Sequence, residues 1–316
     1  MKILLTDSAT VKANNDLSLD IFKNFGEVIE YANINPLQLA DAVKDVDIII
    51  CNKTVIDRKI MEIAPKLKYI GLFATGYNNI DIDAAKEYGI TVCNAGSYST
   101  NAVAQQVMGY ILMHYTKIPM YNDFVHSGGW KNAEVFSPLV FTGDEIFSKT
   151  LGIIGFGSIG QAVKKAAEGL GMKVIVNTRT VKDSSVAEFV DLDTLLRESD
   201  IVSVHCPLND QSADMMNSEA FSKMKDGAFF INTSRGGTVD EQALFDALKS
   251  GKLSGAAVDV LKKEPMDKDC VLADAPNLII TPHTAWAPLT TRKRLLKIVT
   301  DNITSFLEGN PQNKIV

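Results

Sequence analysis

The chain has 316 residues, of which 46% are hydrophobic and 22% are charged, and this composition is typical of a globular protein rather than a disordered or fibrous one. Its length predicts about two domains, at ~150 residues each. The 38 acidic and 32 basic side chains leave a formal net charge of −6, so we expect no nucleic-acid partner, because a duplex-binding surface normally has a basic excess.

Signals of export, membrane insertion and metal binding are missing from the sequence. The first apolar run covers residues 3–5, which is too short for the core of a signal peptide, and no apolar run approaches the ~18 residues of a transmembrane helix. The four cysteines and four histidines show no CxxC, HxxxH or Cys–His ligand spacing. We therefore expect a cytoplasmic protein with no metal site, no disulfide framework and no membrane partner.

Short β-branched apolar runs alternate with longer helical patterns along nearly the whole chain. The runs expected to form strands are residues 3–5, 28–29, 46–51, 69–73, 90–93, 151–154, 173–176, 201–206, 228–231, 255–260 and 278–281. Apolar residues with helical spacing lie between them, most clearly in residues 102–115, 159–171, 241–250 and 292–308. Continuous apolar strands separated by helices favour parallel sheets covered on both faces, and so many strands again predict two α/β domains.

This alternation stops between residues 117 and 150. Pro119, Gly128, Gly129 and Pro138 interrupt any regular period there. Loops of this length in a compact protein usually have a function of their own, so we expect either a long loop or an arm.

A glycine-rich motif follows the apolar run at 151–154 and opens a helical stretch. The motif is Gly155-Phe156-Gly157-Ser158-Ile159-Gly160. Gly155 would permit a tight turn, Gly157 would let a pyrophosphate approach the backbone, and Gly160 would let the helix pack closely on the strand. The strand before and the helix after it favour a dinucleotide-binding loop, with helix amides facing the anion, over a purely structural glycine turn.

The residue that selects between NAD and NADP is expected about 20 residues further on, at the end of the next strand. An NAD-preferring protein would place an acid there, but the sequence has Asn177 followed by Arg179. The Arg179 guanidinium could bind the 2′-phosphate of NADP, or it could stack on the adenine and serve NAD equally well. We therefore expect an NAD(P) cofactor, with NADP slightly favoured.

The later predicted strands each end in a polar or reactive group, and ligands of doubly wound sheets gather at these ends. Arg235, Glu264 and His283 form a plausible reactive set. Reduction of a 2-oxo acid needs a cation to hold the carboxylate, which arginine does with two parallel hydrogen bonds. It also needs a proton donor near neutral pH, which is typical of histidine, and a carboxylate to orient that histidine and favour its protonated form. Taken singly, each residue could instead be an ordinary surface or loop residue.

Four segments resemble the signature of the D-isomer-specific 2-hydroxyacid dehydrogenases. They are Asn232-Thr233-Ser234-Arg235-Gly236, Val258-Asp259-Val260 with Glu264-Pro265 after it, Thr281-Pro282-His283, and the glycine motif with the strand before it. Two further stretches, residues 71–81 and 282–287, are most similar to the glycerate dehydrogenase (hydroxypyruvate reductase) branch. The resemblance covers nearly the whole chain.

This resemblance implies a role for each matched residue. Arg235 would bind the substrate carboxylate, and His283 would be the acid/base with Glu264 as its partner. The backbone amides of Thr75 and Gly76 would also bind the carboxylate, from the opposite domain. The residues that the resemblance implies at the cofactor are Ser158, Ile159, Cys206, Pro207, Thr233 and Asp259. They join Gly155, Gly157 and Gly160 of the motif and Asn177 and Arg179 of the strand end, where the missing acid departs from the family pattern.

Within the cofactor set, Ser158 and Ile159 would contact the pyrophosphate and Asp259 the nicotinamide carboxamide. Asn52, at a strand end, is a further candidate contact in the same cleft.

The family fold implies a Rossmann NAD(P)-binding domain, residues 101–285, inserted in a flavodoxin-like substrate domain, residues 1–100 and 286–316. Hinges would fall near residues 99–102 and 285–290. The helix after Asn101 and the arm at 117–149 resemble the family's dimerisation region, where Trp130 would pack either across a homodimer interface or in a local core.

The expected activity is NAD(P)H-dependent reduction of hydroxypyruvate or glyoxylate to the D-2-hydroxy acid. The alternative is a dinucleotide-sensing binding protein or corepressor without significant turnover.

Overall fold

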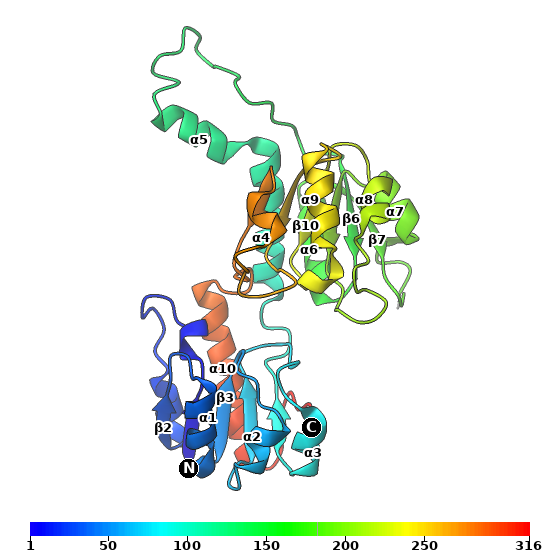
Figure 1. Cartoon of the computed structure of the whole chain (residues 1–316). Helices are drawn as coiled ribbons and strands as arrows, with labels where there is room; N and C mark the ends of the chain where they lie inside the picture. The colour runs from blue at the N-terminus through cyan, green and yellow to red at the C-terminus, as the bar shows by residue number, and fades with distance from the viewer. Residues whose placement is uncertain (182) are drawn as a thin grey trace. The chain divides into compact units, whose positions relative to one another are not determined.

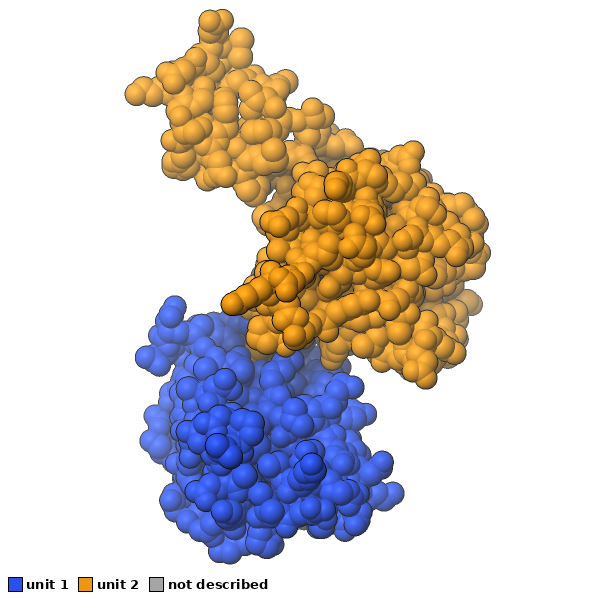
Figure 2. All heavy atoms as spheres, in the orientation of Figure 1, with its two compact units in different colours: residues 1–99, 287–316 blue, residues 100–286 orange. Residues whose placement is uncertain are grey.

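The structure is a computed structural model, and it describes residues 1–181 and 183–316. The chain forms two compact units, which Figure 2 shows in different colours. Unit 1 consists of residues 1–99 and 287–316, and unit 2 consists of residues 100–286. In the described part of the chain, no helix combines the length and the apolar character needed to cross a bilayer.

Unit 1 is built on a parallel sheet in the order β2-β1-β3-β4-β5. Its strands are β1 (Lys2–Leu5), β2 (Glu27–Glu30), β3 (Ile48–Cys51), β4 (Tyr69–Leu72) and β5 (Thr91–Cys93). Its α-helices are α1 (Pro36–Ala42), α2 (Arg58–Glu62), α3 (Ile82–Glu87) and α10 (Leu289–Leu307), with 3-10 turns η1 (Ser8–Thr10), η2 (Asp20–Phe25) and η3 (Val43–Asp45). This strand order is that of flavodoxin-like sheets.

Unit 2 is built on a parallel sheet in the order β12-β11-β10-β9-β6-β7-β8. Its strands are β6 (Thr150–Ile154), β7 (Lys173–Asn177), β8 (Glu188–Phe189), β9 (Ile201–Val204), β10 (Ala228–Asn232), β11 (Leu253–Val258) and β12 (Leu278–Ile280). Its helices are α4 (Thr100–Thr116), α5 (Ile118–His126), α6 (Ser158–Gly169), α7 (Leu192–Glu198), α8 (Ser218–Lys223) and α9 (Glu241–Lys249), with 3-10 turns η4 (Gly236–Thr238) and η5 (Val271–Asp274). The order extends the 3-2-1-4-5-6 Rossmann arrangement by one strand, so the predicted fold class is confirmed.

Helices cover both faces of the seven-stranded sheet. On β10, Phe230 packs into one core with α7, α8 and α9, whereas Phe229 and Ile231 pack into the other with α4 and α6. Because neighbouring side chains of a strand point to opposite faces, a strand buried on both sides must be apolar at every position. This is why the continuous apolar runs predicted strands correctly.

Two elements differ from the predictions. The strand β8 was not predicted, because it has only two residues and pairs with β7 without an apolar run of its own. The segment after residue 117 is not irregular throughout, since it begins with the helix α5. Pro119 lies in the first turn of α5, where a missing N–H is harmless, so this proline starts a helix rather than breaking one. The helix and the chain after it extend away from the sheet of unit 2 (Figure 1).

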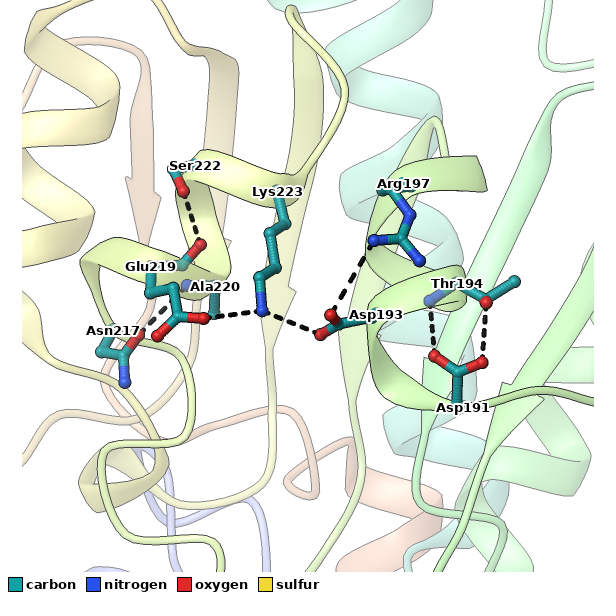
Figure 3. Close-up of polar contacts among 9 residues, drawn as sticks. All are labelled: Asp191, Asp193, Thr194, Arg197, Asn217, Glu219, Ala220, Ser222 and Lys223. Carbon is teal, nitrogen blue, oxygen red and sulfur yellow. Dashed lines mark hydrogen bonds and ion pairs between the residues drawn. The ribbon is translucent and has the colours of Figure 1, made fainter.

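Two side chains of unit 2 cap the helices α7 and α8 (Figure 3). Asp191 accepts a hydrogen bond from the backbone N–H of Thr194 at 2.8 Å, and Asn217 accepts one from that of Ala220 at 3.1 Å. Lys223 bridges the two helices with ion pairs to Asp193 at 3.0 Å and Glu219 at 2.7 Å. The caps satisfy backbone donors that have no partner inside the helix.

Replacing Asp191 with alanine should lower the free energy of unfolding by about 1 kcal/mol, because the substitution removes the N-cap of α7. Chemical denaturation of the purified protein measures this change. Arg197→Ala is the matched control on the same helix: its ion pair with Asp193 is 3.8 Å long and exposed, so we expect a change within about 0.5 kcal/mol. Equal losses in both variants would contradict the capping role.

Candidate active site

The glycine-rich loop joins β6 to α6, which begins at Ser158. Gly155 has φ +96°, and a Cβ there would lie 2.6 Å from the backbone nitrogen of Cys206, so only glycine fits. A Cβ on Gly160 would collide with the carbonyl oxygen of Gly155. At Gly157 no atom lies within 4 Å of the Cβ position. The loop is therefore packed where it meets the sheet and open at the N-terminus of α6, where backbone amides favour an anion.

A cavity of about 910 Å³ opens from this loop, which is large enough for an extended ligand. Most of the residues predicted to bind a cofactor line it, namely Gly155, Gly157, Ser158, Asn177, Arg179, Cys206 and Pro207. Ile159, Gly160, Thr233 and Asp259 do not line it. Lys164, Lys165 and Asp183 also line the cavity and were not predicted; the lysines lie on α6, the helix that the glycine motif opens.

Asn177 and Arg179, at the end of β7, differ in what their side chains do. The Asn177 side-chain amide donates a hydrogen bond from Nδ2 to the carbonyl of Val190 at 3.0 Å. The backbone carbonyl of Asn177 accepts one from the backbone N–H of Gly155 at 2.8 Å. Asn177 therefore links neighbouring loops. Arg179 is exposed on the cavity wall and, among residues 1–181 and 183–316, has no ion-pair partner. Its guanidinium is available to a ligand.

Two polar side chains, His205 and Thr233, directly follow the neighbouring strands β9 and β10. The hydroxyl of Thr233 is buried and has no hydrogen-bond partner among the described residues, whereas nearly all buried polar groups have one, so this hydroxyl is a candidate for contact with a ligand. His205 lines the cavity, and burial lowers the pKa of its ring to about 4, so the ring is neutral at pH 7. Its Nε2 is hydrogen-bonded to Ser203 Oγ at 2.8 Å.

Arg235 stands on a tightly packed turn after β10. The buried amide of Asn232 organises this turn: its Oδ1 accepts from the N–H of Ser234 at 3.0 Å, and its Nδ2 donates to the carbonyl of Arg235 at 3.0 Å. A Cβ on Gly236 would overlap the backbone of Leu261, so the turn lies directly against the segment that leads to Glu264. The Arg235 side chain is exposed, with Nη1 donating to the Ser234 carbonyl at 2.7 Å.

His283 and Glu264 form a hydrogen-bonded pair. His283 Nδ1 lies 2.7 Å from Glu264 Oε2, and Glu264 Oε1 accepts from the backbone N–H of Leu261 at 3.0 Å. An ionised carboxylate can only accept, so Nδ1 carries the proton of this bond. The arrangement fixes the tautomer and the orientation of the ring and leaves Nε2 for a substrate. His283 has φ +54°, an uncommon backbone conformation for a residue with a side chain.

Asp259 holds the turn that carries His283. Its Oδ1 accepts from the N–H of Thr284 at 2.8 Å, its Oδ2 accepts from the N–H of Ala285 at 2.9 Å, and its carbonyl accepts from the N–H of His283 at 2.8 Å. Burial raises the pKa of the Asp259 carboxyl. The sequence did not predict this positioning role, and the predicted contact with the nicotinamide carboxamide stays a prediction.

The remaining predicted residues lie in unit 1. Thr75 and Gly76 follow β4, and the hydroxyl of Thr75 donates to the carbonyl of Gly96. Asn52 follows β3 and is buried, and its backbone N–H donates to Asp7 Oδ1 at 2.9 Å. The structure therefore joins Glu264 to His283, holds Arg235 in the same unit 2, and places the predicted amide ligands of the carboxylate in unit 1.

Asp7, a buried carboxylate after β1, was missed at the sequence level. It accepts hydrogen bonds from the backbone N–H groups of Asn52, Lys53 and Thr54 at 2.6–3.0 Å. It thereby fixes the loop after β3. An acid two residues after an apolar strand was the only signal in the sequence.

A Rossmann-order sheet with an open glycine-rich loop at a helix N-terminus defines a dinucleotide-binding α/β fold. Among the described residues, no group of three or more His, Cys, Asp or Glu side chains is arranged to hold a metal ion.

Comparisons with known proteins identify the family. Residues 108–285 match the model of the D-isomer specific 2-hydroxyacid dehydrogenase, NAD binding domain. A hydroxypyruvate reductase of Blautia hydrogenotrophica is 37% identical over 100% of this chain and 99% of its own length, and a glyoxylate reductase of Thermococcus litoralis is 40% identical over 88% and 86%. A solved structure of an acyclic imino acid reductase in complex with NADPH and D-Arg has a TM-score of 0.86, with 31% identity and 100% coverage of both chains.

The chain belongs to the D-isomer-specific 2-hydroxyacid dehydrogenase family, which confirms the family predicted from the sequence. It is therefore an oxidoreductase with a domain for a nicotinamide dinucleotide.

Proposed function

We propose that this protein reduces hydroxypyruvate or glyoxylate to the D-2-hydroxy acid, as a member of the glycerate dehydrogenase (hydroxypyruvate reductase) branch. The observation that carries the proposal is the His283–Glu264 pair, 2.7 Å between Nδ1 and Oε2, in the same unit as the exposed guanidinium of Arg235. The names of two relatives that match most of the chain, a hydroxypyruvate reductase and a glyoxylate reductase, support it. In this proposal unit 2 is the NAD(P)-binding domain and unit 1 the substrate domain.

The site residues have distinct tasks in the reduction. The reduced nicotinamide, when bound, supplies a hydride to the carbonyl carbon. Arg235 holds the substrate carboxylate through two parallel N–H groups and polarises the carbonyl. His283 gives the Nε2 proton to the carbonyl oxygen, so one hydride and one proton convert the 2-oxo acid to the 2-hydroxy acid. Glu264 keeps the ring in the orientation and tautomer that this transfer needs.

The experiment that tests the function is a measurement of kcat/KM for hydroxypyruvate, glyoxylate, pyruvate and 2-oxobutyrate, each with NADH and with NADPH. We expect a clear preference for hydroxypyruvate or glyoxylate. Pocket contacts that distinguish such small side chains differ by only ~1–3 kcal/mol, so the preference should lie between about 10-fold and 200-fold. Uniformly weak rates would overturn the proposal and support the binding-protein alternative, which the names of the enzyme relatives do not favour.

For the cofactor we propose a slight preference for NADP over NAD. Two observations support this preference: position 177 holds an asparagine instead of an acid, and the exposed Arg179 lies on the cavity wall. The imino acid reductase of similar structure was solved with NADPH.

Arg179→Ala should weaken the binding of NADPH by roughly 10-fold to 100-fold and that of NADH much less, because a charged hydrogen bond to phosphate contributes about 1.5–3 kcal/mol. Fluorescence titration with each dinucleotide measures both changes. Arg197→Ala, an exposed arginine of the same unit outside the cavity, is the control. Equal losses for the two dinucleotides would mean that Arg179 only stacks on the adenine.

We also propose a homodimer formed through the arm, residues 117–149. The helix α5 buries none of its residues. The arm exposes the apolar side chains of Ile118, Met120, Val125, Trp130, Val135, Phe136, Leu139, Val140 and Phe147. An apolar surface of this extent marks an interaction site. Trp130 is 52% exposed and donates to the carbonyl of Phe136 at 3.0 Å, so it does not belong to a local core.

Phe136→Asp combined with Leu139→Asp should convert the dimer to a monomer of 34.5 kDa, because both side chains are about 90% exposed and would be covered in a dimer. Light scattering measures the mass. Leu37→Asp is the matched control, since Leu37 is 85% exposed but lies in unit 1. A monomeric wild-type protein would refute the dimer.

A further inference from the structure

Tyr110 belongs to α4, on the face of the sheet of unit 2 that α4 and α6 cover. It is 2% exposed, so its ring is part of the core. Its hydroxyl oxygen lies 2.5 Å from Thr281 Oγ1, and Thr281 Oγ1 donates to Asp259 Oδ1 at 2.5 Å. These three side chains form a hydrogen-bonded chain, which we call the Tyr110 relay.

The direction of the relay follows from its last member. An ionised Asp259 carboxylate can only accept, so the single hydroxyl proton of Thr281 is directed to it. Thr281 must then accept the proton of Tyr110. The relay therefore leads from α4 to the carboxylate that also accepts the N–H groups of Thr284 and Ala285.

The relay ends on the turn that presents the acid/base residue. His283 lies between Thr281 and Thr284, and its own N–H donates to the carbonyl of Asp259 at 2.8 Å. Its φ of +54° is disfavoured for a residue with a Cβ, so the turn persists because its surroundings hold it. Removal of one member of the network loosens the backbone under the imidazole.

We infer that Tyr110 is a positioning residue for His283, acting through Thr281 and Asp259 on the turn at residues 281–285. The inference rests on the proposed function, because it concerns the acid/base of that reaction. Tyr110 and Thr281 do not line the dinucleotide cavity, so we expect the loss of the Tyr110 hydroxyl to affect proton transfer more than dinucleotide binding. The substitution Tyr110→Phe would keep the aromatic ring and remove only the hydroxyl group.

The test compares Tyr110→Phe, Thr281→Val and Thr281→Ser with the control Tyr115→Phe. Tyr115 is a buried tyrosine of the same helix, and its hydroxyl has no hydrogen bond to any described residue. We expect Tyr110→Phe to lower kcat roughly fivefold, the effect of one net hydrogen bond, with the Kd for NADH and the melting temperature nearly unchanged. Thr281→Val should lower kcat at least as much, Thr281→Ser should retain most of it, and Tyr115→Phe should match the wild type.

A second readout does not depend on turnover. The chain has only four histidines, so ¹⁵N-edited spectra of the imidazole rings can resolve His283. Tyr110→Phe should shift the His283 ring signals and leave those of the exposed His126 in place, whereas Tyr115→Phe should shift neither.

The outcomes separate the two proposals. A wild type that reduces no 2-oxo acid would refute the proposed function, while the imidazole spectra would still test the relay. Wild-type kcat together with unchanged His283 signals in Tyr110→Phe would overturn the inference. Equal losses in Tyr110→Phe and Tyr115→Phe would also overturn it, because α4 would then act only through packing.

Discussion

Replacing His283 with asparagine should lower kcat by about 10²–10⁴-fold, the usual contribution of a general acid. Asparagine tolerates the left-handed backbone that His283 adopts at φ +54°, so the turn should survive while the proton donor is lost. The Kd for NADH should change little, because His283 does not line the dinucleotide cavity. Steady-state kinetics and fluorescence titration measure the two effects.

His126→Asn is the matched control for this experiment. His126 lies on α5, in the arm proposed to form the homodimer; it is exposed in the single chain and has no place in the proposed active site. We expect its kcat to stay within about twofold of the wild type, as for a surface substitution. Near-wild-type turnover from His283→Asn would remove this histidine from the mechanism.

Replacing Arg235 with alanine should lower kcat/KM by roughly 30-fold to 5,000-fold. The range corresponds to the ~2–5 kcal/mol lost when one partner of a hydrogen-bonded charge pair is removed. KM should rise and kcat should fall together, because the guanidinium both holds the carboxylate and polarises the carbonyl. Steady-state kinetics with the preferred 2-oxo acid measure both parameters.

Arg235→Lys makes the test more specific. Lysine keeps the charge but not the planar pair of N–H groups, so its kcat/KM should lie between those of the wild type and Arg235→Ala. The side chain of Arg235 is exposed and the turn beneath it is held by Asn232, so neither variant should unfold the protein. A wild-type KM in Arg235→Ala would exclude this residue as the carboxylate ligand.

Much of the architecture could be predicted because local patterns report burial directly. Each predicted apolar run overlaps a strand of the structure, since a parallel strand covered on both faces must be apolar throughout. The two-residue β8 has no such run. The helix α5 was missed because a proline normally ends a helix, and only its place in the first turn makes Pro119 compatible with one.

The candidate site was predicted in part, for a related reason. Gly155 directly follows an apolar strand, and Arg235 and His283 each come three residues after one, so the strand ends indicated where to look for them. The link of Glu264 to His283 was predicted from the chemistry of the reactive set and from the family resemblance, and the bond of Asn177 to Val190 was not visible at all. Neither contact follows from spacing, because the partners lie on different loops.

Two parallel α/β units, a dinucleotide loop and the residue types of the acid/base set follow from local patterns, because periodicity and strand ends are local properties of a chain. The contacts by which Asp259 holds the His283 turn and Tyr110 meets Thr281, 171 residues further along, arise from the packing of distant segments. A hydrogen bond between such distant residues forms only when both elements pack on the same sheet, and the packing of the whole unit, rather than any short pattern, selects those partners.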